Sequence, residues 1–160
     1  MVNTVHYTIV VEAAHVELAN RLAEAFYGPT GRNTWSCPLS ASKDGTPTHW
    51  GCNGHFEPEF IELMRDTDRI EKAVMGKVPR EDIDAMVKAM TFHQDADPHA
   101  VFVEAGLGIP AEGVQAEAAV KMRQELTRPA KYDLSAVPKY DPVAEAVAAE
   151  AAEADVKDSA

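Results

Sequence analysis

The sequence predicts an α+β fold with a small mixed or antiparallel sheet of βαββαβ (ferredoxin-like) order, added helices and an extended C-terminal arm. Three observations predict it. A β-branched apolar run opens the chain and an amphipathic helical pattern follows it at once, a hairpin signal comes next, and one further apolar run interrupts the later helical segments. This order of elements is that of a split βαβ arrangement. A chain of 160 residues is long enough for one such domain with an appendage.

The first two elements are predicted from their side-chain patterns. The run "TVHYTIVVEA" (4–13) is rich in β-branched and aromatic residues, which indicates a buried strand. The segment "AHVELANRLAEAFYG" (14–28) carries apolar residues at helical spacing, and Gly28 followed by Pro29 is expected to end the helix. Its predicted core-facing residues are Val16, Ala19, Leu22, Ala23 and Phe26.

A hairpin is predicted from the segments "TWSCPLSA" and "TPTHWGC", which flank an Asp-Gly dipeptide at 44–45. Asp-Gly favours a two-residue type I′ turn, because both central residues of that turn need a positive φ. The resulting register pairs Ser40 with His49 and Cys37 with Cys52. Each segment also contains a proline without a donor, so part of the hairpin must be an edge or irregular.

Four residues around this hairpin form a candidate zinc site, namely Cys37, His49, Cys52 and His55. Zinc takes four such ligands in structural sites. In a regular strand His49 and Cys52 point to opposite faces, so a closed site needs a bulge at Gly51. The alternative is a pair of buried thiols with surface histidines. Zinc is the only cofactor considered for this cluster, and the favoured prediction is that no cofactor is bound.

Helices are predicted over 57–77 and 79–93, with Pro79 between them, and over 111–127. The run "HAVFVEAG" (99–106) is expected to be the last strand. The methionines of the middle helices are expected to fill the core.

A second polar cluster, "FHQDADPHA", offers His93, Asp95, Asp97 and His99 as mixed ligands for a divalent ion. The alternative places His93 at a helix C-terminus and treats Asp-Pro as ordinary turn chemistry. The sequence shows neither a glycine elbow nor a phosphate loop, and no basic group lies beside either cysteine. An enzyme is therefore not expected.

Charge restricts the class of partner. The chain has 15 Lys and Arg against 26 Asp and Glu, a net charge of -11 and a pI near 4.9. Such a surface repels phosphates and anionic lipid, so neither a nucleic acid nor a membrane is expected as a partner. The start of the chain resembles neither a signal peptide nor a membrane span, so we expect a cytoplasmic protein when it is made.

The composition changes at Arg128, which predicts a globular domain over 1–127 and an arm over 128–160. Three prolines favour extended backbone in the arm, and its apolar residues would not be needed in an isolated linker. We expect the arm to dock on a neighbouring subunit; its own domain, or a role as an acidic tail for solubility, are the alternatives. The predicted partner-binding residues are Tyr132, Leu134, Val137, Tyr140, Val143 and Val147.

The block that runs from the first strand through "HVELANRLAEAF" to "PTHWGCNGHFEPEFIELM" resembles small, mostly uncharacterised proteins encoded by tailed bacteriophages. The resemblance covers about the first 65 residues, which contain no catalytic motif, and it transfers no residue role. It implies a viral setting, in which an α+β core with an anchoring arm is similar to a structural or accessory component of the particle.

Together these observations favour a non-enzymatic interaction protein, a phage-type structural or accessory virion protein whose arm docks on a neighbouring subunit. The expected partners are protein subunits, either further copies of this chain or other virion proteins, with incorporation into a virion. One alternative is a small zinc-stabilised domain or metalloenzyme. Another is an acidic inhibitor that mimics nucleic acid and occupies a basic groove.

Overall fold

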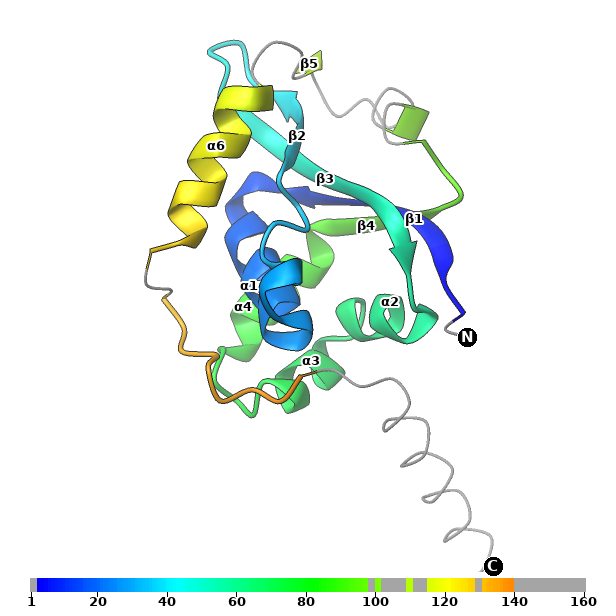
Figure 1. Cartoon of the computed structure of the whole chain (residues 1–160), viewed down its shortest axis with the longest axis vertical. Coiled ribbons are helices and arrows are strands. Elements are labelled where there is room, and N and C mark those ends of the chain that lie inside the picture. The colour runs from blue at the N-terminus through cyan, green and yellow to red at the C-terminus, as the bar shows by residue number, and fades with distance from the viewer. Residues whose placement is uncertain (1–2, 98–99, 102–108, 111–114, 129–130, 140–160) are drawn as a thin grey trace, which may run out of the picture.

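The computed structural model describes residues 3–97, 100–101, 109–110, 115–128 and 131–139 of an α+β protein (Figure 1). Its antiparallel sheet has the strand order β4-β1-β3-β2-β5. The strands are β1 (Val5–Glu12), β2 (Cys37–Ala41), β3 (Pro47–Phe56), β4 (Met90–Gln94) and the two-residue β5 (Ile109–Pro110). The α-helices are α1 (Val16–Tyr27), α2 (Pro58–Met64), α3 (Thr67–Ala73), α4 (Arg80–Lys88) and α6 (Gln115–Leu126), and short 3-10 helices η1 (Ala13–His15) and η2 (Gly28–Gly31) flank α1.

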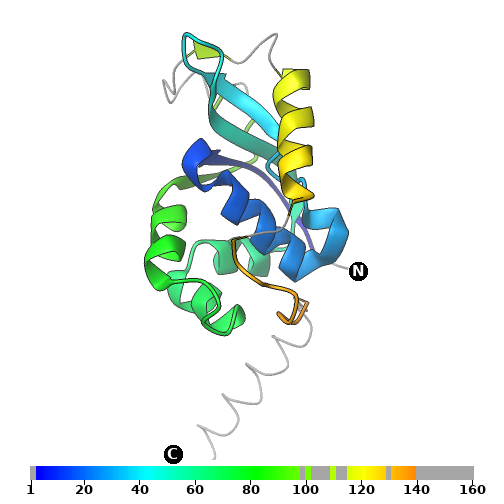
Figure 2. The ribbon, with the colours of Figure 1, turned by 90° about the vertical axis from the view of Figure 1, so that its left-hand side faces the viewer.

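The helices gather on one face of the sheet, as Figures 1 and 2 show from two sides. Alternate residues of a strand point to opposite faces, so each strand contributes every second side chain to this one-sided core. Ile9 and Val11 of β1 and Trp50 of β3 lie in the core together with side chains of the helices. The even-numbered residues of β1 and the odd-numbered residues of β3 consequently face away from the helices.

The predicted core-facing residues of α1 are confirmed, because all five are buried. The predicted helix end is also confirmed, since Gly28 is the C-cap and has a φ of +80°. The sequence did not predict the role of Asn20, which is fully buried on the same helix. Its Nδ2 donates to the Trp35 carbonyl oxygen at 3.2 Å, and its Oδ1 accepts from the Trp35 backbone N–H at 2.9 Å. The Asn20 amide thus supplies the hydrogen-bond partners that another backbone segment would otherwise give to the N–H and C=O of Trp35. These two bonds hold the loop before β2 against α1.

The hairpin forms, and the predicted Ser40–His49 pair is confirmed, but the predicted Cys37–Cys52 pair is wrong. Cys37 pairs with Gly51, because the ladder shifts register between Pro38 and Ser40. The intervening residue is the extra one of a β-bulge.

The turn also differs from the predicted type I′ geometry. Only Gly45 has a positive φ, at +86°, and its N–H donates to the Ser42 carbonyl at 2.9 Å. This is the pattern of a three-residue loop with glycine in the left-handed region. The Asp44 carboxylate accepts from the Ser42 hydroxyl and from the Thr46 N–H, and these bonds lower the pKa of Asp44 to about 2.

Residues 90–93, predicted as the end of a helix, form β4 together with Gln94 and pair with β1. That prediction was wrong because Met90 fits the period of a helix and the period of a strand equally well. It continues the helical spacing of Ile83 and Met86, and with Phe92 it also forms the two-residue alternation of a strand that faces the core. The strand predicted over 99–106 is not seen at Ala100 and Val101, which are helical, and its other residues lie outside the described ranges.

The helix predicted over 57–77 is divided into α2 and α3. Asp66 sits between them as an N-cap, and its side chain accepts from the N–H groups of Asp68 at 3.0 Å and Arg69 at 3.3 Å. The division expected at Pro79 is confirmed, since α4 begins at Arg80. The last predicted helix is confirmed over the described residues of α6.

Gly31 supplies the first testable prediction. A Cβ built on Gly31 would lie 2.2 Å from the carbonyl oxygen and 2.6 Å from the carbonyl carbon of Ala23, so η2 approaches the backbone of α1 too closely for a side chain. We expect Gly31→Ala to lower the free energy of unfolding in urea by about 1–3 kcal/mol. Gly54→Ala is the matched control, because its Cβ would meet the Phe56 ring at an ordinary 3.7 Å. Equal losses in the two variants would contradict the close approach.

Candidate functional site

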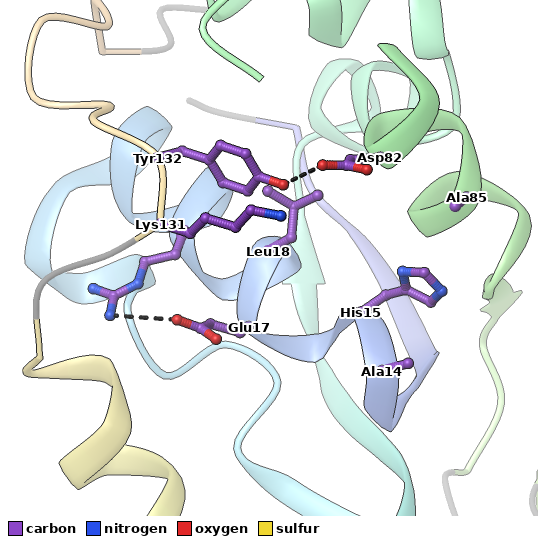
Figure 3. A pocket seen from close by; sticks show the side chains of 9 residues that line it. Ala14, His15, Glu17, Leu18, Asp82, Ala85, Lys131 and Tyr132 are labelled. Atoms are coloured by element: carbon purple, nitrogen blue, oxygen red, sulfur yellow. Dashed lines mark hydrogen bonds and ion pairs between the residues drawn. The ribbon is translucent and has the colours of Figure 1, made fainter. Parts of the chain in front are cut away.

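A pocket with polar and apolar walls lies between η1, α1, α4 and arm residues 131–132, and Figure 3 shows it from close by. Its volume is about 270 Å³, which is near the lower end for a small-molecule pocket. The site combines apolar walls with charges of both signs. The lining residues are Ala14, His15, Glu17, Leu18, Arg21, Asp82, Ala85, Lys131 and Tyr132.

The arm forms one wall of this site, because it packs on its own domain. Val137 is only 5% exposed and belongs to the core, and Tyr132 and Leu134 pack against that core. These three residues were predicted to bind a partner subunit; in the structure they pack against their own domain, with Val137 buried and Tyr132 and Leu134 partly buried. The other three predicted partner-binding residues, Tyr140, Val143 and Val147, lie outside the described residues. The packed core thus extends past residue 127, where the arm was expected to begin.

Arg21 of α1 joins the first helix to the end of the last. Its Nη1 donates to the Leu126 carbonyl at 2.7 Å, and its Nη2 donates to the carbonyls of Arg128 at 2.9 Å and Glu125 at 3.3 Å. The last four carbonyls of a helix have no partner within the helix, and they carry partial negative charge. A guanidinium, which has five N–H donors, satisfies several of them together. The side chain is 12% exposed, and carboxylates of Glu17 and Glu24 lie 3.8 Å away.

Tyr132 links the arm to α4. Its hydroxyl donates to Oδ2 of Asp82, and the Lys131 Nζ lies 5.2 Å from the centroid of the Tyr132 ring. Figure 3 shows the phenol pointing across the site at the carboxylate. The hydrogen bond to Asp82 raises the pKa of Tyr132, because the protonated phenol is the form that can donate. The phenol therefore acts here as a hydrogen-bond donor that fastens the arm, and it is poorly suited to abstract a proton.

The four residues of the predicted zinc site are not brought together. Cys52 lies on the helix-facing side of β3 and packs against the core, whereas His49 and His55 occupy alternate positions on the opposite side. Cys37 is exposed opposite Gly51, and both cysteines are free. Burial raises the pKa of Cys52 to about 12, which keeps it a thiol. Among the described residues, no three His, Cys, Asp or Glu side chains converge as ligands for one metal ion.

The second predicted cluster is similarly dispersed. His93, expected at a helix C-terminus, lies in β4, where its Nε2 is 3.1 Å from the Thr91 Oγ1. Asp95, with a φ of +53°, and Asp97 are exposed, and His99 lies outside the described residues. The strand ends at Gln94 and φ is positive at Asp95, so His93 and the two aspartates do not continue along one extended segment.

Comparison of the chain with protein-family models, with curated proteins and with solved structures finds no match to any of them. In the part of the chain that the structure describes, no helix has the length and apolar character needed to cross a membrane.

The residues that build the site were missed because their sequence context is ordinary. Arg21 is flanked by Glu17 and Glu24 at helical spacing, which is typical of a solvated helix face. Asp82 lies in the first turn of α4, where an acidic side chain is common because it interacts favourably with the positive end of the helix dipole. Its position therefore gave no reason to expect a bond to a distant residue. The available signal was in the arm, where "AKYDL" combines a tyrosine with a leucine two residues later and thus suggests a docked, extended segment.

We predict that Arg21→Met lowers the free energy of unfolding by about 2–3 kcal/mol, because three carbonyl groups lose a charged donor in a mostly buried position. Urea unfolding monitored by tryptophan fluorescence measures the loss. Arg123→Met is the matched control: Arg123 is an exposed arginine of α6, and its replacement should change stability by only a few tenths of a kcal/mol. A similar loss in both variants would show that the carbonyl contacts of Arg21 contribute little.

The Tyr132–Asp82 bond predicts a pH dependence. The raised pKa of Tyr132 in the folded protein means that the bond stabilises the fold fully below the ordinary tyrosine range, and that this contribution is lost as pH rises through the folded pKa. We expect the stability of the native protein to fall more steeply above pH 10 than that of Tyr132→Phe, as measured by thermal unfolding. Asp82→Asn should lower the pKa of Tyr132, followed by tyrosinate absorbance. Parallel stability curves for the native protein and Tyr132→Phe would refute the assignment.

Proposed function

We propose that this chain is a non-enzymatic interaction protein, a phage-type structural or accessory virion protein, and that the segment after Lys139 binds a neighbouring copy of the chain. The observation that carries the proposal is the attachment of residues 131–139 to the core. Val137 is buried, Tyr132 is bonded to Asp82, and the Lys139 Nζ approaches the Glu24 carbonyl at 3.4 Å. This attachment fixes the position of Lys139, the residue that precedes the last 21 residues of the sequence.

The composition of that last segment supports a binding role. It carries six acidic residues against one lysine, and it retains the apolar side chains of Tyr140, Val143 and Val147. The other predicted anchors, Tyr132, Leu134 and Val137, are already accounted for by packing within the chain. Because a second copy of the chain is itself acidic, with a net charge of -11, the contact is assigned to the apolar side chains of the segment and not to its carboxylates.

We further propose that the sheet is a variant of the ferredoxin-like arrangement. Support comes from the strand order β4-β1-β3-β2 and from the connections between the strands. Helix α1 connects β1 to β2, and β3 lies between these two strands in the sheet. Helices α2, α3 and α4 connect β3 to β4, and β1 lies between those two strands. Two such split units are the defining feature of this topology.

The test compares the molar mass of the full chain with that of a chain ending at Lys139, by light scattering over a range of concentrations. Truncation at Lys139 retains Tyr132, Leu134 and Val137, so it leaves the packed core complete. We expect the full chain to form an oligomer and the shortened chain to be monomeric.

A scrambled tail provides the matched control. Shuffling residues 140–160 keeps length and charge but removes the order of the apolar side chains, so a variant with this tail should be monomeric if Tyr140, Val143 and Val147 make the contact. A full chain that is monomeric at all concentrations, or an oligomer that survives truncation, would refute self-association through the tail.

A further inference from the structure

The sheet face that points away from the helices carries two histidines in direct opposition. His6 of β1 and His55 of β3 are cross-strand partners, and their ring centroids are 5.4 Å apart with an interplanar angle of 61°. Directly opposed side chains of an antiparallel pair approach closely enough to act on one small ligand. His55 is exposed and His6 is half-buried, so solvent reaches the pair.

A chain of hydrogen bonds beside this pair determines which nitrogen of His6 carries its proton. Thr8, which is fully buried, donates its hydroxyl proton to the Ala96 carbonyl. The Thr8 oxygen can then accept from the Asn53 side-chain amide, whose Nδ2 lies 2.9 Å away and also lies 3.4 Å from the Ala96 carbonyl oxygen. The Thr8 hydroxyl oxygen and the Ala96 carbonyl oxygen both act as acceptors here, so the NH₂ group of Asn53, and not its oxygen, must point towards them.

The orientation of Asn53 decides the tautomer of His6. With its NH₂ group towards Thr8, Asn53 presents Oδ1 to the His6 Nε2 at 3.1 Å. A carbonyl oxygen only accepts, so Nε2 must be the protonated nitrogen, and in the neutral imidazole Nδ1 keeps its lone pair. Histidines that bind metals have this arrangement, in which one ring N–H donates to a fixed acceptor and the other nitrogen is the ligand.

We propose that His6, through Nδ1, and His55 form a binding site for a divalent cation that prefers imidazole, of the Zn²⁺ and Cu²⁺ class, with water completing the coordination. Asn53 is the positioning residue, because it orients the His6 ring and sets its tautomer without itself binding the metal. The preference follows from ligand chemistry: imidazole suits zinc and copper, whereas magnesium and calcium require oxygen ligands.

This site is distinct from the one predicted around the cysteines. Cys52 faces the helices, on the other side of β3 from His55. His49 shares the outer face of β3 with His55 but stands six residues away, which is about 20 Å along a strand. The proposal also does not depend on the tail that carries the proposed function.

The experiment is calorimetric titration of the untagged full chain, freed of metal by a chelator, with ZnCl₂ and separately with CuCl₂ in a buffer that does not bind metals. We expect one equivalent of either ion to bind. His6→Ala and His55→Ala should each abolish the binding, and Asn53→Ala should weaken it by about 10–100-fold. Asn53→Asp keeps an acceptor for the His6 N–H and should recover most of the affinity.

Two variants separate this site from its competitors. His49→Ala, which removes a histidine from the same strand and face, and the double variant Cys37→Ser/Cys52→Ser should bind metal as the native protein does. Binding that survives both His6→Ala and His55→Ala, binding lost in the cysteine variant, or the absence of binding in the native protein would overturn the proposal. Circular dichroism confirms that each variant is folded.

Nitrogen-15 NMR of the metal-free native protein supplies a second readout that needs no variant. Neutral His6 should show the Nε2–H tautomer, and its Nδ1 resonance should move on addition of diamagnetic Zn²⁺. The Nδ1–H tautomer, or a zinc-induced shift confined to other histidines, would overturn the assignment.

Discussion

The contact between Arg21 and the end of α6 is the constraint on which the arrangement of the arm depends. A mostly buried guanidinium is costly unless its donors are satisfied, and the unpaired carbonyls of a helix end are costly for the same reason. The Nη1 and Nη2 groups of Arg21 donate to the carbonyls of residues 125, 126 and 128, whereas its buried Nε has no hydrogen-bond partner among the described residues. The chain that leaves α6 is thereby directed along α1, where Tyr132 reaches Asp82 and Val137 enters the core.

A second consequence follows from the one-sided core. The helices cover the face of the sheet that carries Ile9, Val11 and Trp50, so the opposite face is free to carry polar side chains. His6, Thr8 and Asn53 occupy that face and bond to one another, with the Ala96 carbonyl as the last acceptor. Thr8 is completely buried although the face is polar, because the turn after β4 brings Ala96 over it. The outer face is thus packed in part, since Val10 and Thr8 are buried there, while His6, Asn53 and His55 on the same face are accessible to solvent.

Comparison of prediction with structure shows where local patterns are sufficient. The stripe of α1, the cap at Gly28 and the break at Pro79 depend on nearest neighbours along the chain, and they are confirmed. The Ser40–His49 pair is also present, but a second register shift between Ser40 and Ala41 produces it, and not the predicted turn. The Cys37–Cys52 pair failed because one extra residue between Pro38 and Ser40 shifts the ladder. The prolines predicted an irregular hairpin, but they did not predict the position of the extra residue. Strand β4 failed because the helical and the extended period share Met90, and pairing with β1 decided between them.

The sequence by itself determined the α+β class, the position of the first strand and helix, and the acidic charge, since these depend on side-chain type and on period alone. Only the tertiary structure decided where the arm lies and which polar residues meet. Arg21 and Arg128 are separated by 107 positions, His6 and Asn53 by 47, and Tyr132 and Asp82 by 50. No periodicity spans such distances. The pairing of strands and the direction of α6 bring these groups together, because each buried donor or acceptor requires a partner from whatever segment the packing places beside it.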